Sequence, residues 1–229
     1  MEFIKGDYFK IEFPELFDGI ITDIPYEAHK DNELINTSQW IFDYKSFMDK
    51  TSRETKHDAF LITFCNLLAL IDLKINQGNW IFHAYQIWNK NRTNWIGFDR
   101  PLRQVEFIAY FKKGDFKFNF RNDLKSKCPK RSQIGLHSND PSRSPKLSQG
   151  TYPEVLSVNN LIDKIHKFEK PLFFTSMFFK IVGDKRVLDP FCGTGSLLCA
   201  FEHGTGVDIE ECRMRQFNPS LQSRQSKVI

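Results

Sequence analysis

The sequence lacks the features that usually identify a secreted, membrane-spanning or metal-binding protein. Its longest apolar stretch, FLITFCNLLALI at 60–71, is too short to cross a bilayer. The first segment, MEFIKGDYFK, has no long apolar core of the kind found in a signal peptide. The five cysteines are odd in number and no pair has the short spacing of a zinc or redox motif. We therefore expect no membrane segment, no metal and a reducing, cytoplasmic location, which would be the host cytoplasm for a viral source.

The chain has no internal repeats, and its 229 residues suffice for one sizeable domain or one domain with an insert. Its composition, 41% hydrophobic and 26% charged, is that of a globular protein. The formal charge of +4 favours a polyanionic partner only weakly when taken alone. Composition therefore sets the class of protein, and function has to be argued from motifs.

Hydrophobic patterning predicts alternating strands and helices. Short apolar runs predict strands at 2–4, 19–22, 58–65, 79–90, 105–114, 185–189 and 205–211. Helical spacing predicts helices at 40–50, 66–78 and 159–182, the last interrupted near Pro171, and a further helix from Ser196 to His203. Residues 27–39 have the composition of a loop, and Phe116, Phe118 and Phe120 alternate as in a half-buried strand.

A basic segment separates the two halves of this pattern. Between Lys112 and Lys146 there are ten basic and three acidic residues, a local charge of +7 that exceeds the charge of the whole chain. The segment is rich in Ser, Pro and Asn and shows little periodicity, which indicates a loop or an insert. It is either a solvated basic loop or a surface for a polyanion.

The region 185–208 has the layout of a nucleoside-cofactor pocket: strand, glycine turn, helix start, strand and acid. Gly193 and Gly195 can adopt a positive φ and let the backbone approach a ligand closely. Asp208 follows Asp189 by 19 residues, close to the spacing of about 20 at which an acid meets ribose hydroxyls. Two carboxylates so close together favour a positively charged cofactor over a pyrophosphate. No lysine follows the glycines as in a P-loop, and a tight turn in any α/β sheet remains the structural alternative.

These residues resemble a known family. VLDPFCGTGS (187–196) is similar to the S-adenosylmethionine-binding loop of the DNA amino-methyltransferases, and IITDIPY (20–26) resembles their catalytic DPPY motif. The catalytic segment precedes the cofactor loop with a basic segment between them, an order that resembles the permuted β class. Ile24 stands where the family has its first proline. The resemblance covers most of the chain outside about 113–158.

Flanking segments resemble the family as well. KGDYF (5–9) is similar to its opening segment, which implies that Asp7 contacts the cofactor's adenine. HKFEKPLFF (166–174) resembles a His-Pro-x-x-Lys-Pro pattern in which Lys170 and Pro171 match and Lys167 replaces the first proline. VEFIAYFKKG (105–114) resembles the strand before the recognition region. The resemblance implies that the cofactor is S-adenosylmethionine, bound by Asp7, Lys170, Asp189, Pro190, Phe191, Gly193, Thr194, Gly195, Ser196 and Asp208.

The catalytic motif suits methylation of an exocyclic amine, whose lone pair is delocalised into the base. Acceptors on its two N–H bonds, the Asp23 carboxylate and the backbone carbonyl of Ile24, would draw the nitrogen toward tetrahedral geometry. Pro25 keeps Ile24 extended. Tyr26 offers a ring for stacking on a base flipped out of the duplex. This chemistry needs the segment around Tyr26 and the turn at Gly193 and Gly195 to form adjoining halves of one cleft.

We therefore expect an α/β, Rossmann-like methyltransferase fold whose mixed, mostly parallel sheet is flanked by helices. Residues 1–112 and 159–229 would form the catalytic domain, and 113–158 a small basic insert for target recognition. The predicted partner is double-stranded DNA; a homodimer and a restriction partner are left open. The candidate phosphate contacts are Arg121, Lys125, Lys127, Lys130 and Arg131.

The expected reaction is site-specific transfer of a methyl group to adenine N6, because family members with Asp in this motif most often act there. Cytosine N4 is the second hypothesis. Ile24 motivates a third, a catalytically weakened homologue that binds cofactor and nucleic acid. Methylation of RNA or of a protein glutamine uses the same chemistry, and the basic segment disfavours the glutamine.

Overall fold

The structure is a computed structural model of the whole chain, and it describes residues 1–25, 42–94, 103–122, 150–159, 166 and 169–210. The elements in chain order are β1 (Glu2–Lys5), the 3₁₀ turn η1 (Tyr8–Lys10), β2 (Phe17–Asp23), α1 (Tyr44–Arg53), β3 (Thr55–Cys65), α2 (Leu67–Ile75), β4 (Ile81–Asn94), β5 (Arg103–Lys113), β6 (Arg121–Asn122), β7 (Gly150–Thr151), β8 (Val155–Ser157), α3 (Leu172–Val182), β9 (Val187–Asp189) and β10 (Gly204–Asp208). No described helix is both long and apolar enough to cross a membrane.

Within the described residues, eight strands form one sheet in the order β1-β10-β9-β2-β3-β5-β4-β8. Seven of these eight strands run in the same direction. Only β5 is reversed, because it pairs antiparallel with both of its neighbours, β3 and β4. The sheet brings the two ends of the chain together, because β2 pairs directly with β9 through Gly19 with Val187 and Ile20 with Leu188. The predicted mixed, mostly parallel α/β fold is confirmed.

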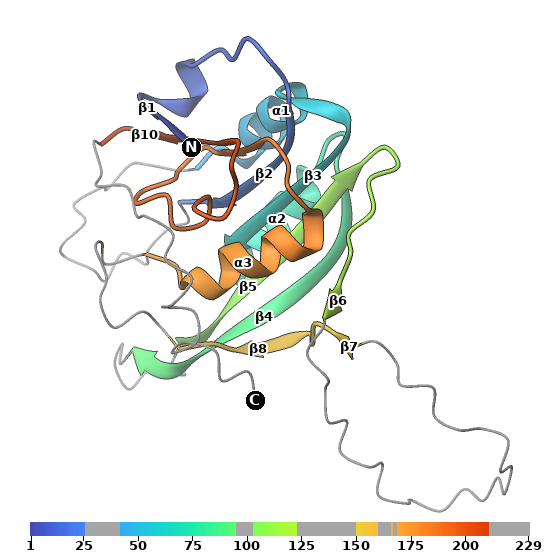
Figure 1. Cartoon of the computed structure of the whole chain (residues 1–229), viewed down its shortest axis with the longest axis vertical. Helices are drawn as coiled ribbons and strands as arrows, with labels where there is room; N and C mark the ends of the chain where they lie inside the picture. Colours follow the sequence, from blue (N-terminus) through green and yellow to red (C-terminus); the bar gives the residue numbers. More distant parts are fainter. Residues whose placement is uncertain (26–41, 95–102, 123–149, 160–165, 167–168, 211–229) are drawn as a thin grey trace, which may run out of the picture.

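Helices cover both faces of this sheet, as Figure 1 shows with α3 in front and α1 and α2 behind. Alternate side chains of the strands point to opposite faces. Ile21 and Ile62 pack with Phe178 of α3, whereas Ile20 and Leu61 pack with Phe47 of α1 in the other layer. Both faces of the sheet are therefore covered by core side chains, which hold the ends of the central strands in fixed positions.

The predicted helix at 196–203 is wrong. The backbone there forms successive turns, in which Leu198 N–H donates to the Gly195 carbonyl and Phe201 N–H to the Leu198 carbonyl, at 3.0 and 2.8 Å. Gly193 and Gly195 have φ of 49° and 69°, so the chain leaves the glycine turn with the wrong backbone geometry to start an α-helix.

The alternation of Phe116, Phe118 and Phe120 predicts a half-buried strand. The three rings are half-buried against the core as expected, but the segment is not assigned to a strand. Instead, Asn119 N–H donates to the carbonyl of Ile181 in α3 at 2.9 Å. The predicted loop at 27–39 lies outside the described residues.

Both ends of the predicted insert, residues 113–158, belong to the main sheet. Lys113 ends β5, and β8 pairs with β4 in the sheet, with Leu156 and Val158 buried in the core. Between these ends, the short ribbon of β6 and β7 is described and residues 123–149 lie outside the description. The described parts of 113–158 therefore frame the predicted insert, whose exact bounds stay a prediction.

Candidate active site

The two motif segments meet at the carboxyl ends of β2 and β9. The Thr22 hydroxyl donates to Asp189 Oδ1 at 2.6 Å, so the IITDIPY segment and the glycine-rich motif are joined by a direct hydrogen bond. Thr22 and Asp189 are both buried. The sequence expectation that these distant segments lie side by side is confirmed by this pairing. Tyr26, the predicted stacking ring, lies outside the described residues.

Asp23 ends β2 and makes an asymmetric set of contacts. Its Oδ2 lies 2.7 Å from the Lys170 ammonium, while its Oδ1 is buried without a hydrogen-bond partner among the described residues. Burial raises the pKa of Asp23 to about 6; Lys170 lowers the pKa and Glu106 raises it. Asp23 is therefore mostly ionised above neutral pH and has one carboxylate oxygen to offer to a donor.

Ile24 and Pro25 continue the chain beyond Asp23. The Ile24 side chain is buried in the layer of α1 and α2, together with Phe42, Phe47 and Leu188. This position therefore serves as a hydrophobic anchor at the place where the DPPY motif has its first proline. Pro25 is half-buried.

Lys170 lies between two carboxylates. Besides the contact with Asp23, its Nζ is 3.1 Å from Glu106 Oε2, and it stands over the ring of Phe64 at 4.9 Å from the centroid. The resemblance implies that Lys170 binds the cofactor; in the structure its ammonium is buried among protein groups, next to the carboxylate of Asp23. Glu106 in turn is paired with Lys90 at 2.6 Å.

Sequence reasoning missed Thr22, Glu106 and Lys90. One signal was available for Glu106, because it is the only acid in the otherwise apolar stretch VEFIAYF. A buried acid in such a strand needs a partner. The sequence does not show that the partner is Lys170, 64 residues further along the chain.

The glycine turn after β9 is held by both of the predicted acids. Gly193 N–H donates to Asp208 Oδ2 at 2.9 Å, and Phe191 N–H donates to Asp189 Oδ1 at 3.1 Å. A Cβ placed on Gly193 would meet no atom within 4 Å, so its backbone borders open space. Of the remaining predicted loop residues, Pro190, Thr194 and Ser196 are buried and Phe191 is half-buried.

Asp189 is the most deeply buried acid of this edge. Desolvation raises its pKa to about 7, the Thr22 hydroxyl and the Phe191 N–H lower it, and the carboxylates of Asp23 and Asp208 raise it further. The loop thus places the carboxyl groups of Asp189 and Asp208 close enough to act on each other. Among the described residues, no cation forms an ion pair with Asp208.

Asp7 is placed beside the same edge by β1, which pairs with β10. Gly6 N–H donates to the Asp208 carbonyl at 2.8 Å, and the Asp7 carboxylate caps η1 through Phe9 N–H. The Tyr8 ring lies edge-on to Phe191, with centroids 5.9 Å apart. The segment that carries Asp7 and Tyr8 therefore lies beside the end of β10 and contacts the ring of Phe191.

The comparisons with known proteins agree with this geometry. A family described as DNA methylase, N6_N4_Mtase, matches residues 17–218. The chain belongs to the N6/N4 DNA methylase family.

Solved structures with the same fold include the M1.HpyAVI–SAM complex, with 17% identity, a TM-score of 0.63 and coverage of 91% of this chain and 92% of that one. M1.HpyAVI alone gives 17% identity and a TM-score of 0.61, covering 92% of both chains. A putative DNA modification methylase from Thermus thermophilus, TTHA0409, gives 19% and 0.55, covering 98% of this chain and 95% of that one. No curated protein sequence matched the methylase. At these identities, the likeness to the solved structures establishes the fold.

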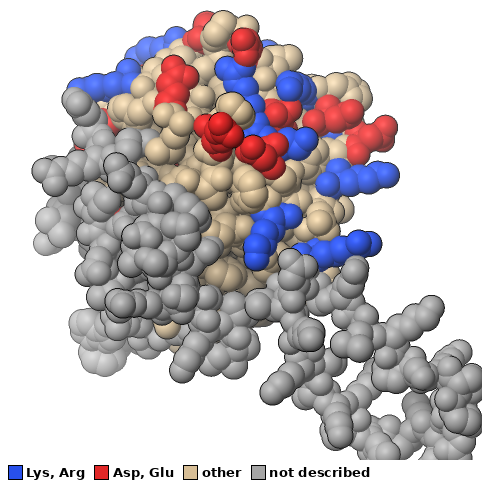
Figure 2. All heavy atoms as spheres, in the orientation of Figure 1, with Lys and Arg blue, Asp and Glu red and all other residues tan. Residues whose placement is uncertain are grey.

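Of the predicted phosphate contacts of this methylase, Arg121 is exposed in β6, and Lys125, Lys127, Lys130 and Arg131 lie outside the described residues. On the face drawn in Figure 2, acidic and basic side chains of the described residues intermingle. Among the described residues, no group of three or more His, Cys, Asp and Glu could hold a metal ion.

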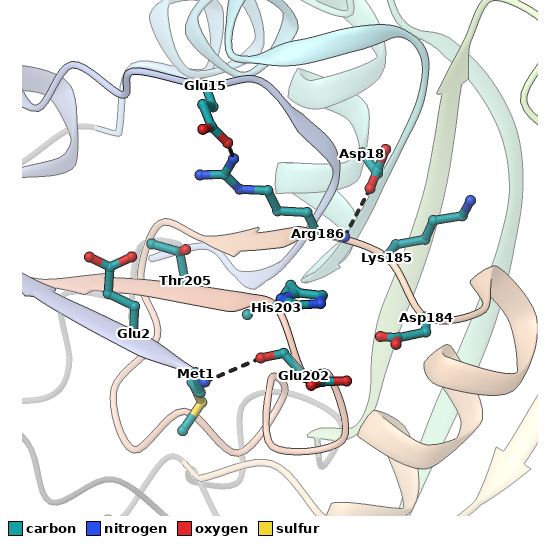
Figure 3. Close-up of a pocket in the computed structure, with 11 residues that line it drawn as sticks. Met1, Glu2, Glu15, Asp18, Asp184, Lys185, Arg186, Glu202, His203 and Thr205 are labelled. Carbon is teal, nitrogen blue, oxygen red and sulfur yellow. Dashed lines mark hydrogen bonds and ion pairs between the residues drawn. The ribbon is translucent and has the colours of Figure 1, made fainter.

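A hollow of about 630 Å³ lies at the opposite edge of the methylase sheet, where β1, β2, β9 and β10 begin. Figure 3 shows Arg186 turned toward Glu15, the Arg186 backbone N–H bonded to Asp18, and the amino terminus bonded to the Glu202 carbonyl. The side chains that line this hollow include both acidic and basic groups, and Arg186 forms an ion pair with Glu15 across it. The motif residues end the same strands at the other edge, so this hollow is separate from the candidate active site.

Proposed function

We propose that this DNA methylase transfers a methyl group from S-adenosylmethionine to the exocyclic N6 of an adenine flipped out of double-stranded DNA. The observation that carries the proposal is the Asp23 carboxylate, which has one oxygen fixed by Lys170 and the other buried without a partner among the described residues. A buried acceptor without a donor is costly, and a substrate N–H would satisfy it.

The residues at the glycine turn fit the proposed cofactor. The space beside Gly193 is open to a ligand, and Asp208 stands at the end of β10, where ribose hydroxyls meet an acid in this type of loop. The carboxylates of Asp23 and Asp208 disfavour the charged form of Asp189, and a cationic ligand relieves this repulsion. When bound, S-adenosylmethionine supplies a methyl group attached to a positively charged sulfur.

The chain's own groups then orient the amine. Asp23 Oδ1 accepts one N–H of the amine, and the backbone carbonyl of Ile24 is the proposed second acceptor. Lys170 keeps Asp23 ionised against the effect of burial, so that the acceptor remains available near neutral pH. The same carboxylate can take the proton that the amine loses after methylation. The contribution of the protein is therefore positioning and electrostatics.

Adenine is preferred to cytosine because the motif begins with Asp23, as in the family members that most often act on adenine. Residues 113–158 are proposed to recognise the target, with Arg121 and the basic residues that follow it on phosphates. Binding to DNA should then weaken steeply as salt is added, because phosphate contacts release counterions.

The test is to incubate the protein with S-adenosylmethionine and unmethylated DNA of mixed sequence, and to measure the modified nucleosides by mass spectrometry. The proposal predicts N6-methyldeoxyadenosine. N4-methyldeoxycytidine alone would overturn the choice of base. Cofactor binding with no methylated nucleoside would show a homologue that has lost catalysis, and methyl transfer only to an RNA competitor would overturn DNA as the substrate.

A further inference from the structure

Four charged side chains of alternating sign run from the catalytic carboxylate into the sheet. Asp23 on β2 contacts Lys170, Lys170 contacts Glu106 on β5, and Glu106 contacts Lys90 on β4. The successive N–O distances are 2.7, 3.1 and 2.6 Å. Lys170 and Glu106 are buried, whereas the Lys90 side chain is 21% exposed. The chain of charges therefore links Asp23 to the solvent.

The register of the sheet places Glu106 at the active-site edge. Asp23 lies opposite Phe64 of β3, Phe64 lies opposite Ile108 of β5, and Glu106 comes two residues before Ile108 on the same face. Because β5 runs antiparallel to β3, its first residues lie beside the carboxyl ends of β2 and β3. Glu106 therefore reaches the Lys170 ammonium from β5, whereas Asp23 reaches it from β2.

We propose that Glu106 is a positioning residue for Asp23: it holds the Lys170 ammonium on one carboxylate oxygen, so that the other oxygen stays available to the substrate amine. The proposal rests on the methyl transfer proposed above. An ammonium has three donors, and the contact with Glu106 Oε2 uses one of them. Without that contact, Lys170 is free to move across both oxygens of Asp23 and to cover Oδ1.

Lys90 has a complementary role in this arrangement. It neutralises Glu106 through Oε1, which leaves Oε2 for Lys170. The groups that act electrostatically on Asp23 from the elements around it are Lys170, Glu106 and Lys90, and the titratable neighbours that sense Asp23 in turn are Asp189 on β9 and Cys65 on β3. Glu106 raises the pKa of Asp23 and Lys90 lowers it. Removing the charge of Glu106 should therefore lower the pKa of Asp23, and removing the charge of Lys90 should raise it.

The experiment measures single-turnover methyl transfer between pH 5 and pH 9 for the wild type, Glu106→Gln, Lys90→Gln and the double variant. Glu106→Gln should move the acid limb of the profile to lower pH by about half a unit or more, because a like charge is removed. Its plateau rate should fall by about tenfold or more, because Lys170 then competes for the acceptor oxygen. Lys90→Gln should move the acid limb to higher pH, and the double variant should return it toward the wild type.

Lys56→Gln is the matched control, because it removes a lysine from an exposed ion pair with Asp18 at the far end of the sheet. It should leave the profile unchanged. Near-ultraviolet circular dichroism confirms that each variant is folded. Since Lys90 is partly exposed, Lys90→Gln supplies the test of sign even where Glu106→Gln does not fold.

The inference is overturned if folded variants shift the acid limb in the same direction, or shift it by no more than Lys56→Gln does. An inactive wild type would instead overturn the proposed methyl transfer. In that case a carbon-13 NMR titration of the Asp23 carboxyl still decides the electrostatic coupling, because opposite displacements in the two variants support it and identical curves refute it.

Discussion

Replacing Asp189 by Asn should make the protein more stable at alkaline pH while weakening its affinity for the cofactor. Asp189 is buried, and its pKa rises from 3.8 to about 7 mainly because burial disfavours the charged form. The folded state thus binds this proton more tightly than the unfolded chain does. The stability that comes from this tighter proton binding by Asp189 is fully present below about pH 4, and it is lost as the pH rises through 7.

The size of the effect follows from the difference between the two pKa values. About three pH units correspond to about 4 kcal/mol, because each unit is about 1.4 kcal/mol. Asn retains the oxygen that accepts from Thr22 and Phe191, but it does not ionise. The gain of Asp189→Asn over the wild type should therefore be small at pH 4 and rise to about 4 kcal/mol near pH 8.

Urea denaturation at pH 4, 6 and 8 measures this gain, and calorimetric titration with S-adenosylmethionine measures the affinity. Affinity should fall by about tenfold or more, because the proposed site for the cationic cofactor then has one carboxylate fewer. Thr22→Val is the matched comparison. It removes the hydroxyl donor from the ionised carboxylate, and it should destabilise the protein by about 1.5–3 kcal/mol at pH 8.

A gain in stability that does not change with pH would refute the assignment of the buried charge to Asp189. A variant less stable than the wild type at pH 8 would refute it as well. An unchanged affinity for the cofactor would show that Asp189 serves only the fold.

Two further predictions concern the support of the site. Lys50→Met breaks a buried pair with Glu54, whose side chains are 8% and 9% exposed, and should cost about 3–5 kcal/mol in urea denaturation. Lys45→Met is the comparison, because it breaks an ion pair of the same i,i+4 spacing on α1, between Lys45 and Asp49, whose side chains are 73% and 42% exposed. The loss of stability should stay below about 1 kcal/mol. Equal losses in the two variants would contradict the reasoning. In Gly193→Ala, the added Cβ would have no atom within 4 Å, but the residue would have to keep a φ of 49°. The variant should therefore lose about 1–2 kcal/mol of stability without cofactor, and its affinity for the cofactor should fall by more than that. An unchanged affinity in calorimetry would contradict an open turn that faces the ligand.

The sequence predicts the adjacency of the two motifs because each of them ends a buried strand of a parallel sheet. The carboxyl ends of parallel strands share one edge, and the pairing of β2 with β9 places Asp23 and Asp189 there. The glycine turn was predictable for a similar local reason, since Gly193 and Gly195 both have positive φ.

The charge network behind Asp23 was not predictable from local patterns. It depends on the antiparallel pairing of β5 with β4, which sets Glu106 opposite Trp88 and within reach of Lys90. Lys170 joins the network from a segment far along the chain. The helix expected after Gly195 failed for another reason, because apolar spacing does not reveal the left-handed backbone that precedes it.

The most direct test of the account compares the wild type with Asp23→Asn in single-turnover methyl transfer to DNA, with cofactor affinity measured on the same samples. Asn keeps the shape of the side chain but removes the charged acceptor. The account predicts that the transfer rate falls by about a hundredfold or more while the cofactor still binds. Transfer at the wild-type rate by Asp23→Asn would contradict it.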